Sequence, residues 1–300
     1  MHFPASSKKK LTAKSLFNVA SVHKVNSDHL HISTRFRLEF WKEVEVELYF
    51  YTENATDLVN AIRQKVTFTH DNSGLAASKW LERILDVTNC ETLNQVDLRG
   101  SPQLDVRDTF ATIQNIEKLY IHGECPNSFA KKFLEIISPV ATGITLFKIP
   151  FETREEFQTF LKSNLNYLTI FTNKFPTFKF TVGDLMVTNA LKLNIGELKL
   201  TVKEINEFFK NWVEKKCGTR LEHLSLSTDE DADERNLLKG LKTVRFPESR
   251  KRTFHYSKEL DSSSDSFSGG YDIRRADRNK ATITFGDVYG ETYIDFYAWR

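Results

Sequence analysis

Two short groups of polar residues could hold a metal ion. His29 and His31 offer imidazole nitrogens but would need further ligands, so we interpret them as a pair of surface or core histidines. Residues 229–234 (DEDADE) offer the carboxylate oxygens that calcium prefers. They lack the alternating ligand spacing and the glycine of an EF-hand loop. We interpret this segment as a solvated acidic loop, and we predict no metal and no other cofactor.

One cysteine has the neighbours that a nucleophile would need. Cys217 follows Lys215 and Lys216, whose charges could lower the pKa of its thiol, but we interpret it as a structural thiol near a helix end. The sequence contains no G-x-G-x-x-G, G-x-x-x-x-G-K-[ST], H-E-x-x-H or G-x-S-x-G motif. We therefore expect a non-enzymatic protein. The rival interpretation is a hydrolase or transferase on an α/β fold, which would show a deep polar pocket with convergent titratable groups.

The strongest pattern in the sequence is a repeated spacing of apolar residues. The motif apolar-x-x-apolar-x-apolar occurs seven times, starting at residues 93, 116, 144, 165, 195, 221 and 241, in steps of 23, 28, 21, 30, 26 and 20 residues. Leucine-rich repeats run at roughly 20–29 residues and share this L-x-x-L-x-L core. Amphipathic stretches between the motifs, at 127–137, 153–161 and 201–213, favour helices.

These observations predict an α/β fold, namely an irregular leucine-rich-repeat-like solenoid. We expect a mostly parallel curved sheet, helices on its outer side and a C-terminal β-hairpin cap. The pattern is loose, however, and three apolar positions in six also recur by chance in any α/β protein. In this frame Leu119, Leu168, Leu198 and Leu224 are central and buried, and Phe208 and Trp212 anchor the helix over 201–213, with Asn206 and Lys210 facing water.

Side chains alternate along a strand, so each motif also presents residues that point away from the core. Aromatic, histidine and arginine residues among them suit a protein interface, because they bury a large area with little loss of rotamer freedom. The alternative is that helices or loops cover this face and the aromatics serve packing. The candidate partner-binding residues are Asp97, Arg99, Lys118, Tyr120, His122, Tyr167, Phe171, Lys199, His223 and Arg245.

The pattern divides the chain into four parts. We expect an N-terminal segment at 1–30 with a helix from residue 16, a strand and helix cap at 31–92, and the solenoid at 93–246. Residues 247–300 should form a flexible Ser/Gly-rich loop at 260–270 and a closing hairpin with strands at 281–285 and 293–297. The charged run at 248–252 is read as a solvated turn, with a phosphate contact as the alternative, and the serines at 262–264 could be phosphorylated.

Composition limits the class of partner and compartment. The formal net charge of +2 argues against a dedicated nucleic-acid surface. No apolar run reaches the ~18 residues that a membrane span needs. Three widely spaced cysteines form no CxxC pair, which is typical of buried thiols in a reducing compartment. We expect a cytoplasmic or nuclear protein whose partner is another protein, with neither nucleic acid nor membrane involved.

Three segments resemble the nematode-type F-box-associated domain, type 2. The first, residues 190–226, resembles that family's strand, its helix with Asn-x-Phe-x-x-x-Trp (Asn206, Phe208, Trp212) and its Leu-Glu-x-Leu-x-Leu, here 221–226. The second, YDIRRADRNKATITF, is similar to the family's Asp-Ile-x-Arg-x-Asp-Gly-x-x-Ala-Thr-Ile, with Arg278 where glycine is usual, and a closing Phe-x-x-Trp (Phe296, Trp299) follows. The third is LERILDVTNCETLNQVDL.

The resemblance covers about residues 75–300, and it implies the substrate-binding region of an adaptor in a Skp–cullin–F-box ubiquitin ligase. The resemblance also makes residues 1–30 a candidate F-box remnant. F-boxes usually open on a Leu-Pro pair, and none occurs near the start of this sequence. The segment SSKKKLTAK offers few apolar anchors for docking, so we expect weak or no binding to the Skp-type linker. A structural or binding solenoid without a ubiquitin link is the alternative function.

Overall fold

The structure is a computed structural model. It describes residues 29–39, 42–51, 67–69, 82, 92–99, 107, 110, 113–172, 174–175, 177–230, 232–288 and 291–299. Most of the candidate F-box remnant, and most of the helix expected from residue 16, lie outside these ranges.

A small three-stranded sheet forms the N-terminal part of the described chain. Strand β1 (His29–Glu39) pairs antiparallel with β2 (Lys42–Tyr51), and the short β3 (Thr67–Thr69) runs parallel to β2. The alternation of valine and glutamate from Val44 onward predicted the second of these strands, because side chains of opposite character then fall on opposite faces.

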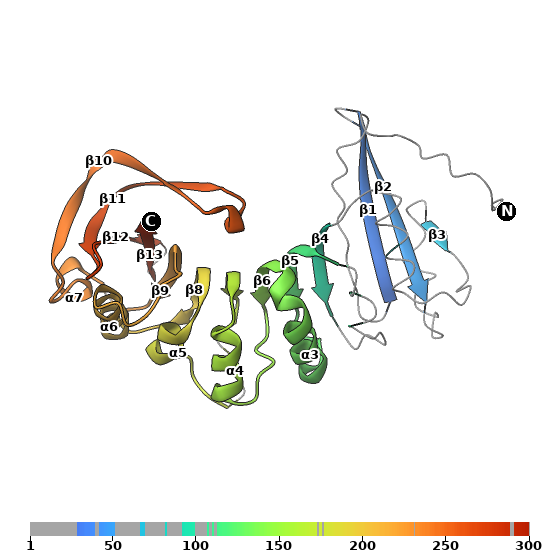
Figure 1. Cartoon of the computed structure of the whole chain (residues 1–300), viewed down its shortest axis with the longest axis horizontal. Coiled ribbons are helices and arrows are strands. Elements are labelled where there is room, and N and C mark those ends of the chain that lie inside the picture. Colours follow the sequence, from blue (N-terminus) through green and yellow to red (C-terminus); the bar gives the residue numbers. More distant parts are fainter. Residues whose placement is uncertain are drawn as a thin grey trace.

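A ten-stranded sheet forms the rest of the fold, and its first six strands are parallel (Figure 1). These are β4 (Thr92–Leu98), β5 (Asn115–Ile121), β6 (Ala141–Leu146), β7 (Leu165–Ile170), β8 (Ala190–Lys199) and β9 (His223–Thr228). Four antiparallel strands follow β9 in the spatial order β13 (Glu291–Trp299), β12 (Lys280–Val288), β11 (Ser264–Arg274) and β10 (Thr243–His255). The expected hairpin is therefore present as β12 and β13, and it pairs with β9.

Helices connect the parallel strands and lie along one side of the sheet (Figure 1). They are α3 (Asn127–Ile137), α4 (Arg154–Leu161), α5 (Val182–Val187) and α6 (Val202–Val213), and α7 (Glu234–Leu237) joins β9 to β10. The described chain also has the 3-10 turns η3 (Ser138–Val140) after α3 and η4 (Lys258–Leu260) between β10 and β11. The three expected helices are confirmed as α3, α4 and α6. The capping box that begins α6 is present, because the Thr201 hydroxyl accepts from the Glu204 amide and the Glu204 carboxylate accepts from Thr201.

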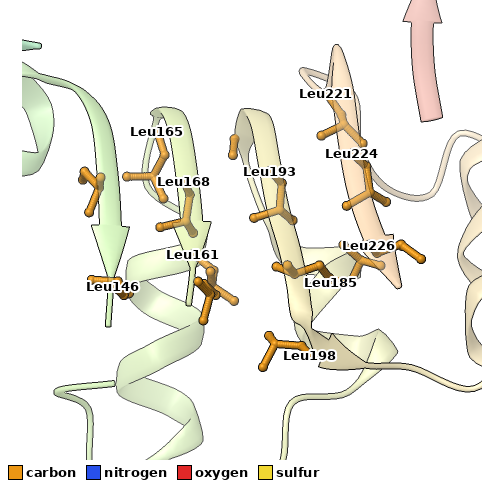
Figure 2. Close-up of a cluster of buried hydrophobic side chains, with 14 of the residues drawn as sticks. Leu146, Leu161, Leu165, Leu168, Leu185, Leu193, Leu198, Leu221, Leu224 and Leu226 are labelled. Carbon is orange, nitrogen blue, oxygen red and sulfur yellow. The ribbon is translucent and has the colours of Figure 1, made fainter. Parts of the chain in front are cut away.

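Strand pairing aligns one apolar triplet across the six parallel strands. Its first residues are 93, 116, 141, 165, 190 and 221, so the steps are 23, 25, 24, 25 and 31 residues. Every residue of these triplets is buried, and Figure 2 shows leucines of β7, β8 and β9 beside Leu161 of α4 and Leu185 of α5. The triplets are Leu93/Val96/Leu98, Ile116/Leu119/Ile121, Ala141/Ile144/Leu146, Leu165/Leu168/Ile170, Ala190/Leu193/Ile195 and Leu221/Leu224/Leu226.

Two triplets were expected in the wrong register. The sequence pattern started them at Ile144 and Ile195, whereas the ladder starts them at Ala141 and Ala190. Alanine is a weak hydrophobic signal, and a second apolar triplet begins inside each strand. The correct frame makes the spacing more regular. Leu119, Leu168, Leu198 and Leu224 are nonetheless all buried as expected.

The region after residue 240 differs from the expectation. The seventh motif does not extend the parallel array, because β10 pairs antiparallel with β11 at the far edge of the sheet, and Val244 is exposed. The charged run at 248–252 lies within β10 rather than in a turn. The expected flexible loop at 260–270 is instead η4 followed by β11. Pairing with β10 and β12 makes much of this segment a strand, which its local composition does not indicate.

Helix α6 packs as expected on its apolar face but not on its polar one. Phe208 and Trp212 are buried, and both rings contact Phe296 of β13. The expectation that Asn206 meets water is wrong. Its side-chain amide is buried and donates to the carbonyls of Leu237 and Lys239, at 2.8 and 3.1 Å, which ties α6 to α7. Asparagine at this position therefore has a structural role.

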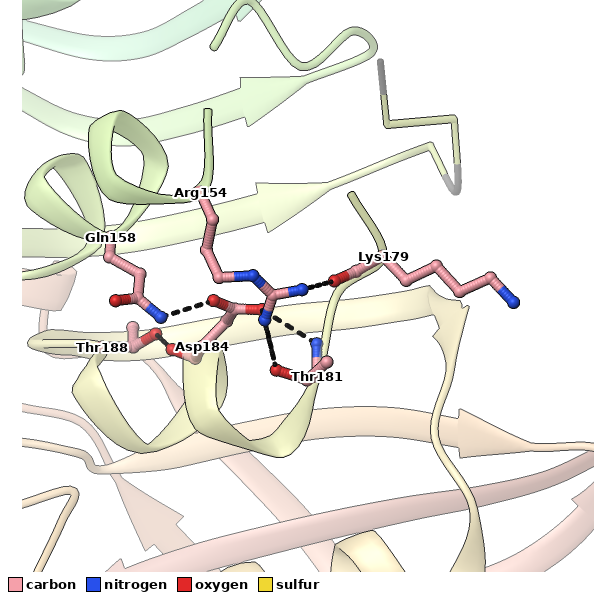
Figure 3. A network of polar contacts seen from close by, with 6 residues as sticks. All are labelled: Arg154, Gln158, Lys179, Thr181, Asp184 and Thr188. Carbon is pink, nitrogen blue, oxygen red and sulfur yellow. Dashed lines mark hydrogen bonds and ion pairs between the residues drawn. The ribbon is translucent and has the colours of Figure 1, made fainter. Parts of the chain in front are cut away.

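A buried carboxylate joins α4 to α5 (Figure 3). Asp184 is fully buried and accepts hydrogen bonds from Arg154 Nη1 at 3.1 Å and Gln158 Nε2 at 2.8 Å. It also accepts from the Thr181 amide at 2.9 Å, while Arg154 Nη2 donates to the carbonyl of Lys179 at 2.7 Å. A buried charge is tolerated when it is paired and hydrogen-bonded in this way.

We predict that replacing a central residue of the register is costly. Leu168→Ala should lower the free energy of unfolding by ~2–5 kcal/mol, because Leu168 is fully buried between neighbouring triplets and the space cannot close completely. Lys162→Ala, at an exposed position just after α4, is the matched control and should change it by less than ~0.5 kcal/mol. Urea unfolding measures both. A loss below ~1 kcal/mol for Leu168→Ala would contradict the register.

The turn between β11 and β12 has an unusual residue. Arg278 lies in the left-handed region with φ of 75°, and its amide donates to the Arg275 carbonyl at 2.8 Å. Glycine, which the resembling family usually has there, adopts this conformation without steric cost.

We predict that Arg278→Gly stabilises the chain by roughly 0.5–1 kcal/mol. The left-handed conformation costs a residue with a Cβ ~1–2 kcal/mol, and the greater freedom of glycine when unfolded offsets part of that gain. Arg274→Gly, in β11, should instead destabilise. Thermal unfolding of both variants checks this, and a lower midpoint for Arg278→Gly would show that the turn is not strained.

Candidate partner-binding surface

The face of the sheet opposite the helices carries polar and aromatic side chains in rows. Paired residues of neighbouring strands lie side by side, so one row runs through equivalent positions of the ladder. Its members, in strand order, are Gln95, Lys118, Gly143, Tyr167, Lys192, His223 and Tyr297. A second row contains Asp97, Tyr120, Thr145, Thr169, Asn194 and Ser225.

A third row lies one residue beyond the last buried position of each strand. The amides of His122, Phe147 and Phe171 donate to the carbonyls of Leu98, Ile121 and Leu146, which extends the ladder by one residue. The ring of Phe147 stacks on His122 at 5.0 Å between centroids and on Phe171 at 5.5 Å. These separations match the ~4.8 Å between strands, so the backbone sets the stacking.

Tyr120 joins this row from the second one and completes what we call the aromatic patch: Tyr120, His122, Phe147 and Phe171. Its ring stacks on Phe147 at 6.2 Å. Phe147 is 38% exposed and Phe171 is 50% exposed, whereas the apolar residues of the aligned triplets are buried. An exposed contiguous group of rings of this kind is typical of a protein-binding surface.

Asp97 orients the histidine of the patch. Its Oδ1 lies 2.9 Å from His122 Nε2, and its Oδ2 accepts from Gln95 Nε2 at 2.6 Å. Asp97 itself is buried, so its role is to hold the His122 ring against Phe147 rather than to meet a partner. This pair fixes the end of the patch on β5.

The other end of the same face is covered by a segment that we call the strap, residues 252–265, which joins β10 to β11. Phe254, Tyr256 and Leu260 of the strap pack on Leu191 and Tyr297 in a separate apolar cluster. The turn η4 contacts β7, and the Ser257 amide donates to the Glu222 carboxylate at 3.0 Å. The alternative that a loop covers the candidate face therefore holds for this end.

A group of polar side chains lies beneath the strap. The Tyr256 hydroxyl is 2.7 Å from His223 Nδ1, donates to Asp265 and accepts from Lys192 Nζ at 3.2 Å. His223 Nε2 is 2.9 Å from Asp295 Oδ1. Burial raises the pKa of the Tyr256 hydroxyl, and the hydrogen bond to Asp265 raises it further, so the hydroxyl stays protonated and remains a donor. These convergent titratable groups satisfy one another and fasten the strap to β8, β9 and β13.

The structure brings some of the predicted site residues together and separates others. Tyr120, His122 and Phe171 form the patch, and Arg99 and Lys118 are exposed beside it. Tyr167 and His223 pack against the strap instead. Lys199 lies past a bulge in β8, where it pairs with Asp229 and Glu291. Arg245 lies on β10, near Glu248, and is not part of this face.

Phe147 belongs to the site but was not predicted. In the expected register it was an inward apolar residue of the third motif, and the shift to Ala141 turns it outward. A spacing argument could have found it, because starting that motif at residue 141 gives steps of 23, 25 and 24. Phe147, which links His122 to Phe171, was therefore not predicted, because Ala141 is too weak an apolar signal to mark the start of its motif.

The thiols among the described residues are not activated. Burial raises the pKa of Cys125 and of Cys217 to about 11, and the nearby Lys148 and Arg275 only partly oppose this. Both cysteines are free and buried, as expected. The candidate nucleophile Cys217 is thus a neutral packed thiol at physiological pH. No cluster of three metal-ligating side chains, and no helix long and apolar enough to cross a membrane, occurs in the described ranges.

A comparison with known protein families finds one match within this array. Residues 156–226 match the family described as F-box associated. The F-box-associated resemblance is confirmed over these residues. The matched segment runs from α4 to the end of the last apolar triplet and includes Phe171. No curated protein matches the chain, and no solved structure matches it. F-box-associated regions are protein-interaction modules, which fits an exposed aromatic surface.

We predict that Tyr256→Phe loosens the strap. The change removes one hydroxyl that Lys192, His223 and Asp265 share, and leaving buried polar groups unpaired costs ~1–3 kcal/mol. Amides of residues 252–265 should therefore exchange with solvent roughly 5- to 100-fold faster, as measured by hydrogen–deuterium exchange. Tyr293→Phe is the control, because that hydroxyl bonds only the exposed Glu291. Unchanged exchange in Tyr256→Phe would show that apolar packing alone holds the strap.

Proposed function

We propose that this chain is the substrate-recognition part of an F-box-type ubiquitin-ligase adaptor, acting in the cytoplasm or nucleus. The observation that carries the proposal is the aromatic patch. Phe147 and Phe171 stack in the open on a face that the helices leave free, and Phe171 lies within the F-box associated match. Rings held in place by the strands lose little freedom on binding, which suits them as anchors for a protein partner.

The proposal includes the finer architecture. We regard the strand–helix array as an irregular leucine-rich-repeat-like solenoid, supported by parallel pairing at steps of 23 to 25 residues before the last, longer step. The four-part division of the chain, with the solenoid as the recognition part, stands as part of the same proposal. Of the predicted site residues we retain Arg99, Lys118, Tyr120, His122 and Phe171, and we add Phe147.

The second candidate function is a binding solenoid without a link to ubiquitin. The same surface supports it, since nothing in the aromatic patch itself requires a ligase. Depleting the chain from cells separates the two. The abundance and half-life of captured partners should rise if the chain is an adaptor and should stay constant if it only binds. Co-elution with a Skp-type linker is expected to be weak, and a tight complex would make the N-terminal segment a functional F-box.

We predict that removing the two phenylalanines abolishes partner capture. Phe147→Ala together with Phe171→Ala should reduce recovery of specific partners at least ~30-fold, because truncating anchor residues costs 2 kcal/mol or more. Affinity purification with mass spectrometry from cells expressing each variant measures this. Tyr293→Ala, another exposed aromatic outside the patch, is the matched control and should retain the partners. Equal recovery with the double variant would contradict the proposed surface, provided that both variants melt like the parent chain.

A further inference from the structure

The aromatic patch continues into positive charge at its β4 end. Arg99 follows Leu98 of β4 at the position equivalent to His122, Phe147 and Phe171, so it extends the third row by one strand. Lys118 lies on the neighbouring strand β5, in the first row. Both side chains are exposed, and neither makes a hydrogen bond or ion pair with another described residue.

Among the described residues of these rows, the carboxylate beside the cations is already engaged. Asp97, paired with Tyr120 on the ladder, is buried and bonded to His122 and Gln95. The next side chains along the second row, Thr145 and Thr169, are neutral. Within the described part of the chain, this end of the face therefore carries positive charge without an ion-pair partner over β4 and β5, and exposed rings over β6 and β7.

At the opposite end of the same face, an equivalent lysine contacts aromatic rings and a carboxylate of the strap. Lys192, equivalent to Lys118 in the first row, lies over the rings of Tyr167 and Tyr256 at 5.2 and 4.3 Å and pairs with Asp265 of the strap at 3.9 Å. The strap thus covers its part of the face with aromatic and apolar side chains and with a carboxylate. Lys118, Arg99 and the patch offer the same combination of cation and rings with no covering segment among the described residues.

We propose that the open end of this face binds an extended acidic segment of a partner protein, with a carboxylate over Arg99, added positive charge from Lys118 four residues away along the strands, and an apolar side chain over Phe147 and Phe171. This inference rests on the proposed recognition function and specifies its ligand. Arg99 and Phe171 are three strands apart, or ~14 Å at ~4.8 Å per strand. An extended chain advances ~3.3 Å per residue, so the acidic residue and the apolar residue are separated by about four positions.

The order of contacts follows from the row. A segment that crosses the strands places its apolar side chain on the exposed Phe147–Phe171 stack, where burial of apolar area drives association. Its carboxylate then lies against the Arg99 guanidinium, which can donate two parallel hydrogen bonds to the carboxylate oxygens, and Lys118 adds positive charge. The cations therefore favour this partner over a purely apolar peptide, and the exposed rings favour it over a purely acidic peptide.

The test uses a displayed library of random 12-residue peptides selected against the full chain. Selected peptides should carry Asp or Glu about four positions from a Leu, Ile, Met or aromatic residue. A synthetic, fluorescently labelled copy of the best peptide should bind at least ~10-fold more weakly to Arg99→Glu/Lys118→Glu, and also to Phe147→Ala/Phe171→Ala, in fluorescence anisotropy. Lys162→Glu, which reverses an exposed charge outside this face, should leave its affinity unchanged.

The charge-reversed chain provides a second, independent selection. Arg99→Glu/Lys118→Glu should enrich Lys or Arg in place of Asp or Glu while keeping the apolar residue. Enrichment of apolar peptides without an acid, or binding that survives the charge reversal, would overturn the acidic-segment proposal. The recognition function would still stand if Phe147→Ala/Phe171→Ala loses cellular partners, so failure of the two proposals can be told apart.

Discussion

The alignment of one apolar triplet across the parallel strands is the constraint on which the rest of the structure depends. A six- or seven-residue strand with a single apolar face cannot bury that face alone, and a short helix in water is marginal. Stacking in register lets each strand share its apolar residues with two neighbours and with the helix beneath. The steps of 24 and 25 residues are the length of chain that one strand, one helix and two turns require between β5 and β8. The longer final step accommodates α6, whose Phe208 and Trp212 reach the β13 ring of Phe296.

The same register determines what the opposite face presents. Because residues one position beyond the triplets are held side by side, a histidine and two phenylalanines there must stack, and they do so at about the strand separation. Where the sheet becomes antiparallel after β9, the strap closes over Tyr167, Lys192 and His223. One face thus has two ends of different character. The strap covers one end, whereas no described segment covers the other, which carries rings and cations that have no ion-pair partner among the described residues. The proposed recognition function uses only the open end.

Sequence reasoning reached the strands and helices whose signals are local. The period-2 run from Val44, the amphipathic helices α3, α4 and α6, and the closing hairpin all follow from patterns that a few residues carry. Sequence patterns did not predict the register or the strands that depend on pairing with residues distant in the sequence. Ala141 and Ala190 open their triplets only because Ile116 and Leu165 lie opposite them. The serine-rich segment at 264–268 is a strand because it pairs with residues 251–255. For the candidate site, alternation predicted that Tyr120, His122 and Phe171 point away from the core, as they do. It did not predict that the strap buries His223 or that Phe147 turns outward.

The free chain exposes the aromatic patch and buries the aromatics under the strap. Hydroxyl-radical footprinting with mass spectrometry tests this difference in exposure without knowledge of the partner, since side-chain oxidation follows solvent exposure. We expect Phe147 and Phe171 to be oxidised many times faster than Phe254 and Tyr297, which are buried to within a few per cent of full burial. Comparable oxidation of all four, or protection of Phe147 and Phe171 in the free chain, would contradict it.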